Sequence, residues 1–229
     1  MTMSFFSINY WRGLKMVNIG LLGDISVGKT SILRLFVRYL NKGEIENVEG
    51  GKKCTIVKTD FSGEATIPGG EKEDKLNQKE TKTIHPNRIV FRENATNRAH
   101  TIFAPGGDSS RAVVKMGIIT ISRIASQIIA VFSCDREIET QFGFFNDIRF
   151  FPDQIFASIN KVDLIEGNKT QRQKKVEEIK KQIETFFKAK KIGIKEFFIT
   201  CGETVEGFED IEAYNDRVAE MILKITTGN

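Results

Sequence analysis

Residues 23–30, with the sequence GDISVGKT, constrain the fold of this chain more than any other segment. They match the pattern G-x-x-x-x-G-K-S/T, and an apolar strand pattern over 16–22 precedes them. A helical pattern follows, with apolar residues on one side over 32–40. A glycine-rich turn between a strand and a helix points backbone N–H groups at one concave point, where the helix N-terminus adds partial positive charge. The sequence therefore predicts a phosphate-binding loop, or P-loop.

The last two residues of the predicted loop have the most specific roles. Lys29 is expected to reach and neutralise the β- and γ-phosphates of a nucleotide, and the Thr30 hydroxyl is expected to bind Mg²⁺. The other residues expected around the phosphates are Asp24, Ile25, Ser26, Val27, Gly28 and Ser31. An ordinary strand–turn–helix is the alternative interpretation, and the strand before the motif and the helix after it argue against that alternative.

The composition narrows the class of protein. The chain has 229 residues, 40% of them hydrophobic and 28% charged, which suits one soluble domain with a sizeable core. A net charge of +4 is too small for a dedicated nucleic-acid binder, so no specific nucleic-acid partner is expected. The three cysteines form no C-x-x-C pair and are expected to be reduced, buried thiols of a cytoplasmic protein. The longest apolar region, 112–133, contains Lys115 and Arg123 and is too polar to span a membrane.

Strand and helix patterns alternate along the chain, which favours an α/β fold. We expect a P-loop NTPase architecture, a mostly parallel twisted sheet of about six strands with helices on both faces. A single domain over 16–229 is expected to follow an N-terminal extension over 1–15. Loops are expected over 43–53 and, as a long polar turn, near 63–83. Strands are expected over 55–61, 127–133, 154–159 and 196–200, and within 89–103, interrupted over 92–98. Further helices are expected over 109–123, 137–151, 170–190 and 208–225.

A second motif, NKVD, follows the predicted strand 154–159. It lies at the carboxyl end of that strand, where α/β sheets place ligands. An Asp163 carboxylate can accept hydrogen bonds from the N1–H and the 2-amino group of guanine, and adenine presents neither donor. Asn160 can bond the base and hold the P-loop, while the Lys161 stem can cover the ring. In the later turn TCGET, a backbone N–H, assigned to Gly202, can donate to guanine O6.

Together these elements resemble the Ras-superfamily small GTPases over residues 15–225. GDISVGKT looks like the phosphate loop, NKVD like the guanine-specificity motif, and TCGE, with Cys201 and Gly202, like the third base contact. The resemblance implies a molecular switch that binds GTP or GDP with Mg²⁺ and hydrolyses GTP. Residues 55–61, TIVKTDF, are similar to the T-I-G-x-D-F stretch of Rab-like members with one extra residue. This implies Thr55 as the switch threonine that ligates Mg²⁺, with Thr59 as the fallback.

The segment resembling the second switch departs from the family pattern D-x-x-G, often followed by glutamine. Here the sequence over 103–107 is FAPGG. Gly106 matches the glycine whose N–H meets the γ-phosphate, Phe103 replaces the aspartate that supports Mg²⁺, and Gly107 replaces the glutamine that orients water. The departure implies slow unaided hydrolysis, accelerated by a partner. A P-G turn without that aspartate resembles the MglA-type branch, whereas TCGETVEGF is similar to the C-A-T-S-G-x-G-L ending of the Arf group, and both placements stay open.

Three residues are candidates to replace the missing glutamine. Arg111 is expected to offset charge on the transferring phosphoryl group as an arginine finger in cis, or else to be a surface helix residue. Asp108 and His100 are the others, although a half-buried strand residue is the more common role for such a histidine.

Two surface features carry open interpretations. The extension 1–15 can place five apolar residues on one helical face, similar to the amphipathic N-terminal helix of Arf-type GTPases: Met3, Phe6, Tyr10, Trp11 and Leu14. Thr2 stands where N-myristoylation requires glycine, so the segment either packs on the domain or makes peripheral membrane contact. Residues 169–195 carry ten Lys or Arg against three Glu, either as a solvated face or as a surface for anionic lipid or an acidic partner.

The sequence therefore favours a GTP-binding switch that works with effector, exchange and GTPase-activating proteins. A GTP-bound scaffold with little or no hydrolysis is the first alternative, favoured by Phe103 and Gly107. A P-loop kinase is the second, and NKVD argues against it because base selectivity matters less in that class.

Overall fold

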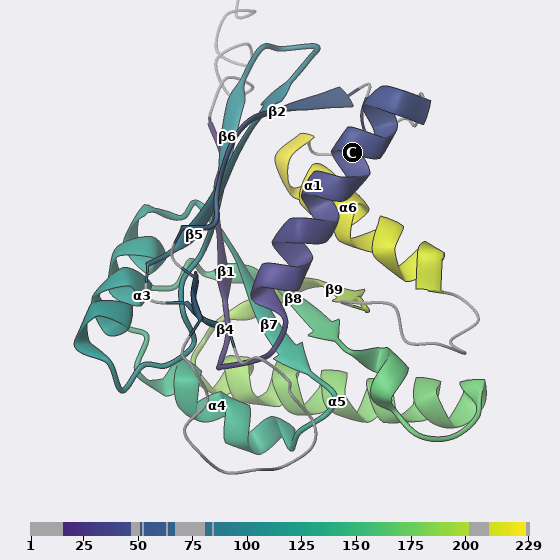
Figure 1. Ribbon diagram of the computed structural model, residues 1–229. Helices are drawn as coiled ribbons and strands as arrows, with labels where there is room; N and C mark the ends of the chain where they lie inside the picture. The colour runs from purple at the N-terminus through teal and green to yellow at the C-terminus, as the bar shows by residue number, and fades with distance from the viewer. Residues whose placement is uncertain are drawn as a thin grey trace, which may run out of the picture.

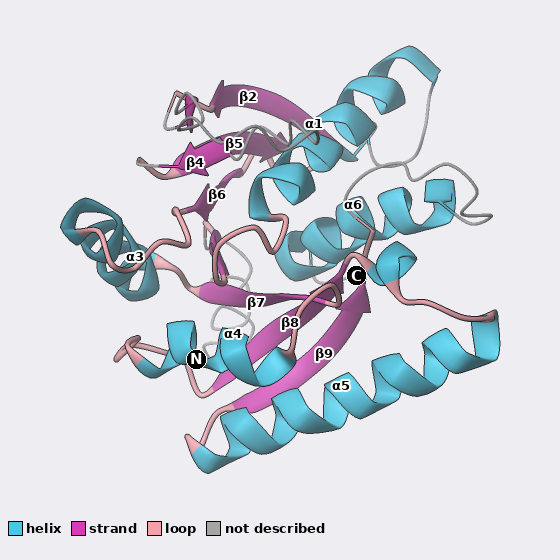
Figure 2. Ribbon diagram, turned by 60° about the horizontal axis from the view of Figure 1, so that its bottom comes forward, coloured by secondary structure: helices cyan, strands magenta, loops and turns pink. Residues whose placement is uncertain are grey.

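The computed structural model places the P-loop at the centre of a seven-stranded sheet. It describes residues 16–46, 51, 53–62, 64–66, 81–83, 85–201 and 211–227. The seven strands are β1 (Asn18–Leu22), β2 (Cys54–Asp60), β5 (Asn87–Glu93), β6 (Ala99–Ala104), β7 (Gln127–Ser133), β8 (Gln154–Asn160) and β9 (Gly193–Ile199). Their order is β2-β5-β6-β1-β7-β8-β9. Figure 2 shows β2, β5 and β6 in its upper part, with β7, β8 and β9 following below them.

Six of the seven strands run in the same direction, and β5 alone is reversed. β1 pairs with β6 and β7, and β7, β8 and β9 follow one another in parallel. Only β5 and β2 complete the sheet through antiparallel pairs. The carboxyl ends of β1, β6, β7, β8 and β9 therefore meet at one edge, which brings together loops that are far apart in sequence.

Helices cover both faces of the sheet, as predicted. They are α1 (Lys29–Glu46), α3 (Ala112–Ile124), α4 (Ile138–Asn146), α5 (Lys169–Ala189) and α6 (Ile211–Thr227). α1 and α6 lie on one face and α3, α4 and α5 on the other (Figures 1 and 2). Each face has its own buried core, because β1 and β7 alternate their apolar side chains between the two layers.

The apolar periodicity located α5 closely. Val176, Ile179, Ile183 and Phe187 are buried, as that period requires. The helix begins at a capping box. The Asn168 side chain accepts from the Gln171 N–H, and the Gln171 side chain accepts from the Asn168 N–H.

Three local predictions are corrected by the structure. The predicted loop at 43–53 begins too early, because α1 continues through the buried Gly43 to Glu46. Part of the polar turn near 63–83 is an antiparallel pair, β3 (Glu64–Thr66) with β4 (Thr81–Thr83). The helix expected over 137–151 ends at Asn146, and Phe151 beyond it packs its ring 5.9 Å from that of Phe187. Core packing therefore overrides the helical pattern there.

Some predictions fall outside the described residues. These are the extension 1–15 and the turn position Gly202. Among the helices that are described, none combines the length and the apolar character needed to cross a membrane.

Candidate functional site

The P-loop lies between β1 and α1, and its lysine is buried. The Lys29 ammonium donates to the carbonyl oxygens of Gly23 and Asp24, each at 2.7 Å. Burial lowers the pKa of Lys29 from 10.5 to about 7; the Asp24 charge opposes this shift and the Arg136 charge adds to it. An anionic group placed beside Lys29 would restore its full positive charge, because an opposite charge favours the protonated form. The lysine is therefore suited to hold phosphate.

Gly28 is required where the P-loop meets the NKVD motif. Its φ of +92° lies in the left-handed region, and a Cβ atom there would lie 2.2 Å from the Asn160 side-chain nitrogen. Both the backbone conformation and the close approach therefore demand glycine.

Asn160 holds the P-loop as predicted. Its Nδ2 donates to the Val27 carbonyl oxygen at 3.0 Å, while its Oδ1 accepts from the Thr200 hydroxyl at 3.0 Å. The Ser158 and Thr200 hydroxyls lie 2.9 Å apart, and all three polar side chains are fully buried. Sequence analysis did not assign roles to Ser158 or to Thr200. The signal that could have found them is a hydroxyl-bearing residue near the end of each strand, Ser158 within β8 and Thr200 directly after β9.

The predicted base-recognising carboxylate is held by a neighbouring thiol. Cys201 Sγ donates to Asp163 Oδ1 at 2.8 Å, and Cys201 is fully buried. Asp163 lies in η2 (Val162–Leu164), a single 3-10 turn that follows Lys161 in the left-handed conformation at φ 61°. The structure therefore brings Asn160, Asp163 and Cys201 together at the edge where β8 and β9 end.

The loop between β7 and α4 adds two charged residues that sequence analysis missed. Lys161 Nζ donates to Asp135 Oδ2 at 2.5 Å. Burial is the largest single influence on the pKa of Asp135 and would raise it. The hydrogen bond from Lys161 acts together with other neighbouring polar and positively charged groups, and their combined effect lowers that pKa. The Arg136 guanidinium donates to the Ile25 carbonyl oxygen at 2.5 Å and lies 3.4 Å from an Asp24 carboxylate oxygen. Neither residue belongs to a recognised motif, so only the tertiary structure reveals them.

Thr30 and Thr55 do not lie together. The Thr30 hydroxyl accepts from the buried Asn87 amide at 3.2 Å, at the start of β5. Thr55 pairs with Arg92, which pairs with Ala99, whereas Asn87 pairs with Ala104. Measured along β6, the position of Thr55 is therefore five residues from that of Asn87, the partner of Thr30. This is roughly 16 Å at about 3.3 Å per residue.

The predicted sharing of one Mg²⁺ by Thr30 and Thr55 is therefore wrong in this structure. Thr55 instead donates its hydroxyl hydrogen to Asn94 Oδ1 at 2.8 Å, beside the β5–β6 turn. The physical reason is topological, since β2 begins at the end of the sheet remote from the P-loop. The fallback, Thr59, pairs with Ile89 and lies nearer to the P-loop end. The Thr30 hydroxyl fits a Mg²⁺ ligand of the P-loop type, whereas the side chain of Phe103 carries no oxygen that could ligate the ion.

Gly107 lies against the P-loop. A Cβ atom at this position would lie 2.3 Å from the Ile25 nitrogen and 2.5 Å from the Asp24 carbonyl oxygen. The segment that carries Gly106 is thus in direct contact with the phosphate-binding loop. In this conformation position 107 has no room for a side chain, which explains in steric terms why glycine stands there.

The candidate replacements for glutamine lie in different surroundings. Arg111 Nε pairs with Asp108 Oδ2 at 3.0 Å, next to α3. His100 is fully buried, with its ring 5.3 Å from that of Phe91, and its Nδ1 accepts from the Val17 N–H at the start of β1. His100 is therefore remote from the P-loop and belongs to the core, and burial lowers its pKa.

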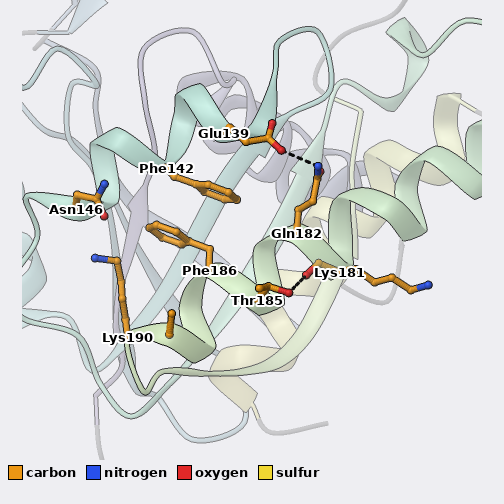
Figure 3. Close-up of a pocket in the computed structure, with 9 residues that line it drawn as sticks. Glu139, Phe142, Asn146, Lys181, Gln182, Thr185, Phe186 and Lys190 are labelled. Atoms are coloured by element: carbon orange, nitrogen blue, oxygen red, sulfur yellow. Dashed lines mark hydrogen bonds between the residues drawn. The ribbon is translucent and has the colours of Figure 1, made fainter.

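A groove of about 650 Å³ lies elsewhere, between α4 and α5 (Figure 3). Its lining includes Phe142 and Phe186, whose stacked rings have centroids 4.2 Å apart. Lys181 and Lys190 line it as well. None of the residues that line it belongs to the predicted nucleotide site, so the groove is a separate surface feature.

Comparison with known proteins supports the fold rather than a family. No protein-family model matches the chain, and no curated protein matches its sequence. Translation elongation factor SelB from Methanococcus maripaludis, in complex with the GTP analogue GppNHp, has a similar structure, with a TM-score of 0.51 and 13% identity. The match covers 94% of this chain and 34% of SelB. The two proteins share an α/β fold, which confirms the predicted fold class.

Other solved structures are similar over part of their length. Roco2 RocCORdC from Methanosarcina barkeri, bound to GDP, matches with a TM-score of 0.45 and 20% identity, over 94% of this chain and 54% of that one. A bacterial selenocysteine-specific elongation factor, EF-Sec, matches with a TM-score of 0.48 and 12% identity, over 91% and 29%. This chain therefore spans less than two thirds of each of these proteins.

Proposed function

We propose that this chain binds guanine nucleotides and acts as a GTP-dependent molecular switch. The observation that carries the proposal is the hydrogen bond from Asn160 to Val27, which joins the base motif to the phosphate loop. Two motifs more than a hundred residues apart in sequence thus form one site. The GTP analogue bound to the similarly folded SelB is consistent with this proposal.

Different residues would bind the phosphates, the base and the metal ion. Lys29 and the P-loop N–H groups hold the phosphates, and Asp163 accepts from the guanine edge with its position fixed by Cys201. A bound Mg²⁺ would neutralise phosphate charge, with Thr30 as its protein ligand. The Gly106 N–H would sense the γ-phosphate, a role supported by the close approach of the adjoining Gly107 to the P-loop. Ordering of this segment by GTP, and its release after hydrolysis, would supply the switch.

Titration with labelled nucleotides tests the binding proposal. The purified chain should bind GTP and GDP at least about 100-fold more tightly than ATP, because adenine leaves the Asp163 carboxylate unpaired. Lys29→Met should abolish binding, while Lys115→Met, which changes an exposed lysine away from the site, should not. A preference for ATP would contradict the proposal and favour a P-loop kinase.

We further propose that unaided GTP hydrolysis is slow. Position 107 has no room for a water-orienting side chain, and Arg111 is engaged by Asp108. A single-turnover assay checks this, and rapid hydrolysis by the chain alone would contradict it. A GTP-bound scaffold is favoured by the same two observations; it predicts that GTP co-purifies with the protein and persists for hours.

Effector, exchange and activating proteins, together with a cytoplasmic or peripheral membrane location, remain parts of this proposal. Sedimentation with liposomes, comparing the full chain with one lacking residues 1–15, tests the membrane part. Equal pelleting of the two would contradict a role of that segment in membrane contact.

A further inference from the structure

The loop that joins β7 to α4 sends two adjacent charged side chains to two different parts of the candidate site. Asp135 accepts from Lys161 of the NKVD motif at 2.5 Å. Arg136, the next residue, donates to the Ile25 carbonyl oxygen of the P-loop at 2.5 Å and faces the Asp24 carboxylate. One short segment therefore touches both the predicted base side and the predicted phosphate side.

The start of this loop is held by hydrogen bonds from α4 and from the end of β8. Gln141 is fully buried in α4, and its amide accepts from the Ser133 N–H and donates to the Ser133 carbonyl oxygen, both at 2.9 Å. The Cys134 N–H donates to the Asn160 carbonyl oxygen at 3.0 Å. A buried amide satisfied on both sides holds one geometry, because any shift leaves a buried polar group unpaired. Asp135 and Arg136 thus start from a defined position.

The Arg136 contact acts on the shape of the P-loop more than on overall stability. Its side chain is 37% exposed and that of Asp24 is 26% exposed, so water screens their ion pair. The hydrogen bond to the Ile25 carbonyl is different in kind, since it restrains the peptide plane of a loop residue. Lys29 restrains the two preceding carbonyls from the other direction. Two cations therefore hold three successive carbonyl groups, leaving the loop N–H groups to converge on an anion.

We propose that Asp135 and Arg136 form a clamp that couples guanine recognition to the grip of the P-loop on phosphate. This inference rests on the proposed nucleotide-binding function. Both are positioning residues: Asp135 holds the Lys161 side chain beside the base, and Arg136 holds the P-loop ready for phosphate. Because they are consecutive residues, a base that orders Lys161 also orders the loop, and through Arg136 the P-loop.

A double-mutant cycle on GDP binding tests this coupling. The variants are Asp135→Asn, Arg136→Ala and the pair together, with the release rate of labelled GDP as the measurement. Each single change should speed release by about tenfold. The double change should speed it by much less than the hundredfold product, because either change alone already breaks the clamp. Arg136→Lys should recover part of the loss, since an ammonium can still donate to Ile25.

A matched control and a second readout separate positioning from general damage. Lys115→Ala removes an exposed ion pair with Asp147 at 3.5 Å, away from the site, and should change release by less than twofold. In the nucleotide-free protein, Asp135→Asn should speed amide hydrogen exchange over residues 23–28, although Asp135 does not touch them. A merely local role would leave that exchange unchanged.

The outcomes distinguish this inference from the function on which it rests. Multiplicative effects of the two changes, in a protein that binds GDP normally, would overturn the clamp and leave the proposed function standing. Unchanged exchange over 23–28 in Asp135→Asn would overturn it as well. If the unmodified chain bound no guanine nucleotide, the proposed function would fall and the clamp with it.

Discussion

The candidate site has two halves whose residues are held differently. We call the half around Asn160 and Asp163, proposed to bind the base, the base side, and the half around Thr30, proposed to bind Mg²⁺, the metal side. On the base side, Asn160, Thr200 and Ser158 form an unbroken buried hydrogen-bond chain that reaches Val27 of the P-loop. On the metal side, Thr30 bonds Asn87 while Thr55 lies near the opposite end of the sheet.

The difference follows from topology. Residues attached to the carboxyl ends of neighbouring parallel strands are brought together whenever the sheet forms. A residue placed by resemblance near the start of an edge strand has no such guarantee. β2 points the same way as β1, so its first residues lie at the end of the sheet away from the P-loop. The base side is therefore the more firmly specified half of the site.

The largest effect is expected where the base side meets the P-loop. Asn160→Ala leaves the Val27 carbonyl without its side-chain partner and takes from the buried Thr200 hydroxyl one of its two partners, which should lower the free energy of unfolding by about 2–4 kcal/mol. Chemical denaturation measures this. Asn168→Ala, which removes an exposed helix cap, is the control and should cost about 1 kcal/mol. Equal losses would show that the buried chain is no more important than a surface cap.

Base selectivity is the next test of that half. Asp163→Asn replaces an acceptor with a mixed donor and acceptor, so the preference for GDP over xanthosine diphosphate should shift by about 100-fold. Xanthine presents an oxygen where guanine has its amino group. Competition titration measures the shift, and an unchanged preference would remove Asp163 from the base site.

The contact of Gly107 with the P-loop should be sensitive to a single methyl group. Gly107→Ala puts a Cβ atom 2.3 Å from the Ile25 nitrogen, and displacing that backbone should cost about 1–3 kcal/mol. Gly143→Ala, within helix α4 and with open space around the new atom, should instead stabilise by about 0.5–1 kcal/mol. Denaturation midpoints compare the two, and a neutral Gly107→Ala would contradict the close approach.

Burial of Lys29 should make stability depend on pH. Its folded pKa of about 7 lies below its ordinary 10.5, so the unfolded state binds more protons between these values. The free energy of unfolding of the nucleotide-free protein should therefore rise with pH across that window. Lys29→Met should lose this increment, and urea denaturation at pH 7.5 and 9.5 measures it. Identical pH dependence in both proteins would mean that the lysine is not desolvated.

The smallest effect is expected at Thr55. Thr55→Ala breaks an exposed hydrogen bond to Asn94, so Mg²⁺-dependent GDP affinity should change by less than twofold. Thr30→Ala should weaken the same affinity at least tenfold. Titrations with Mg²⁺ and with EDTA separate the two, and a large effect of Thr55→Ala would show that β2 rearranges when nucleotide binds.

The sequence by itself determined the α/β fold, the position of the GDISVGKT loop after the central strand and that of the NKVD motif at the end of β8. These follow from local chemistry, since apolar runs form strands, glycine permits the φ of +92° at Gly28, and periodicity gives the buried face of α5. Boundaries were less accurate, as the early end of α4 shows, because packing of Phe151 is a long-range effect.

Only the tertiary structure decided the position of Thr55, the close approach of Gly107 and the contacts of Asp135, Arg136 and Asn87. Each depends on strand order, strand direction or the path of a loop. Those properties arise when segments distant in sequence bury surface against one another, and no local pattern of residues encodes them.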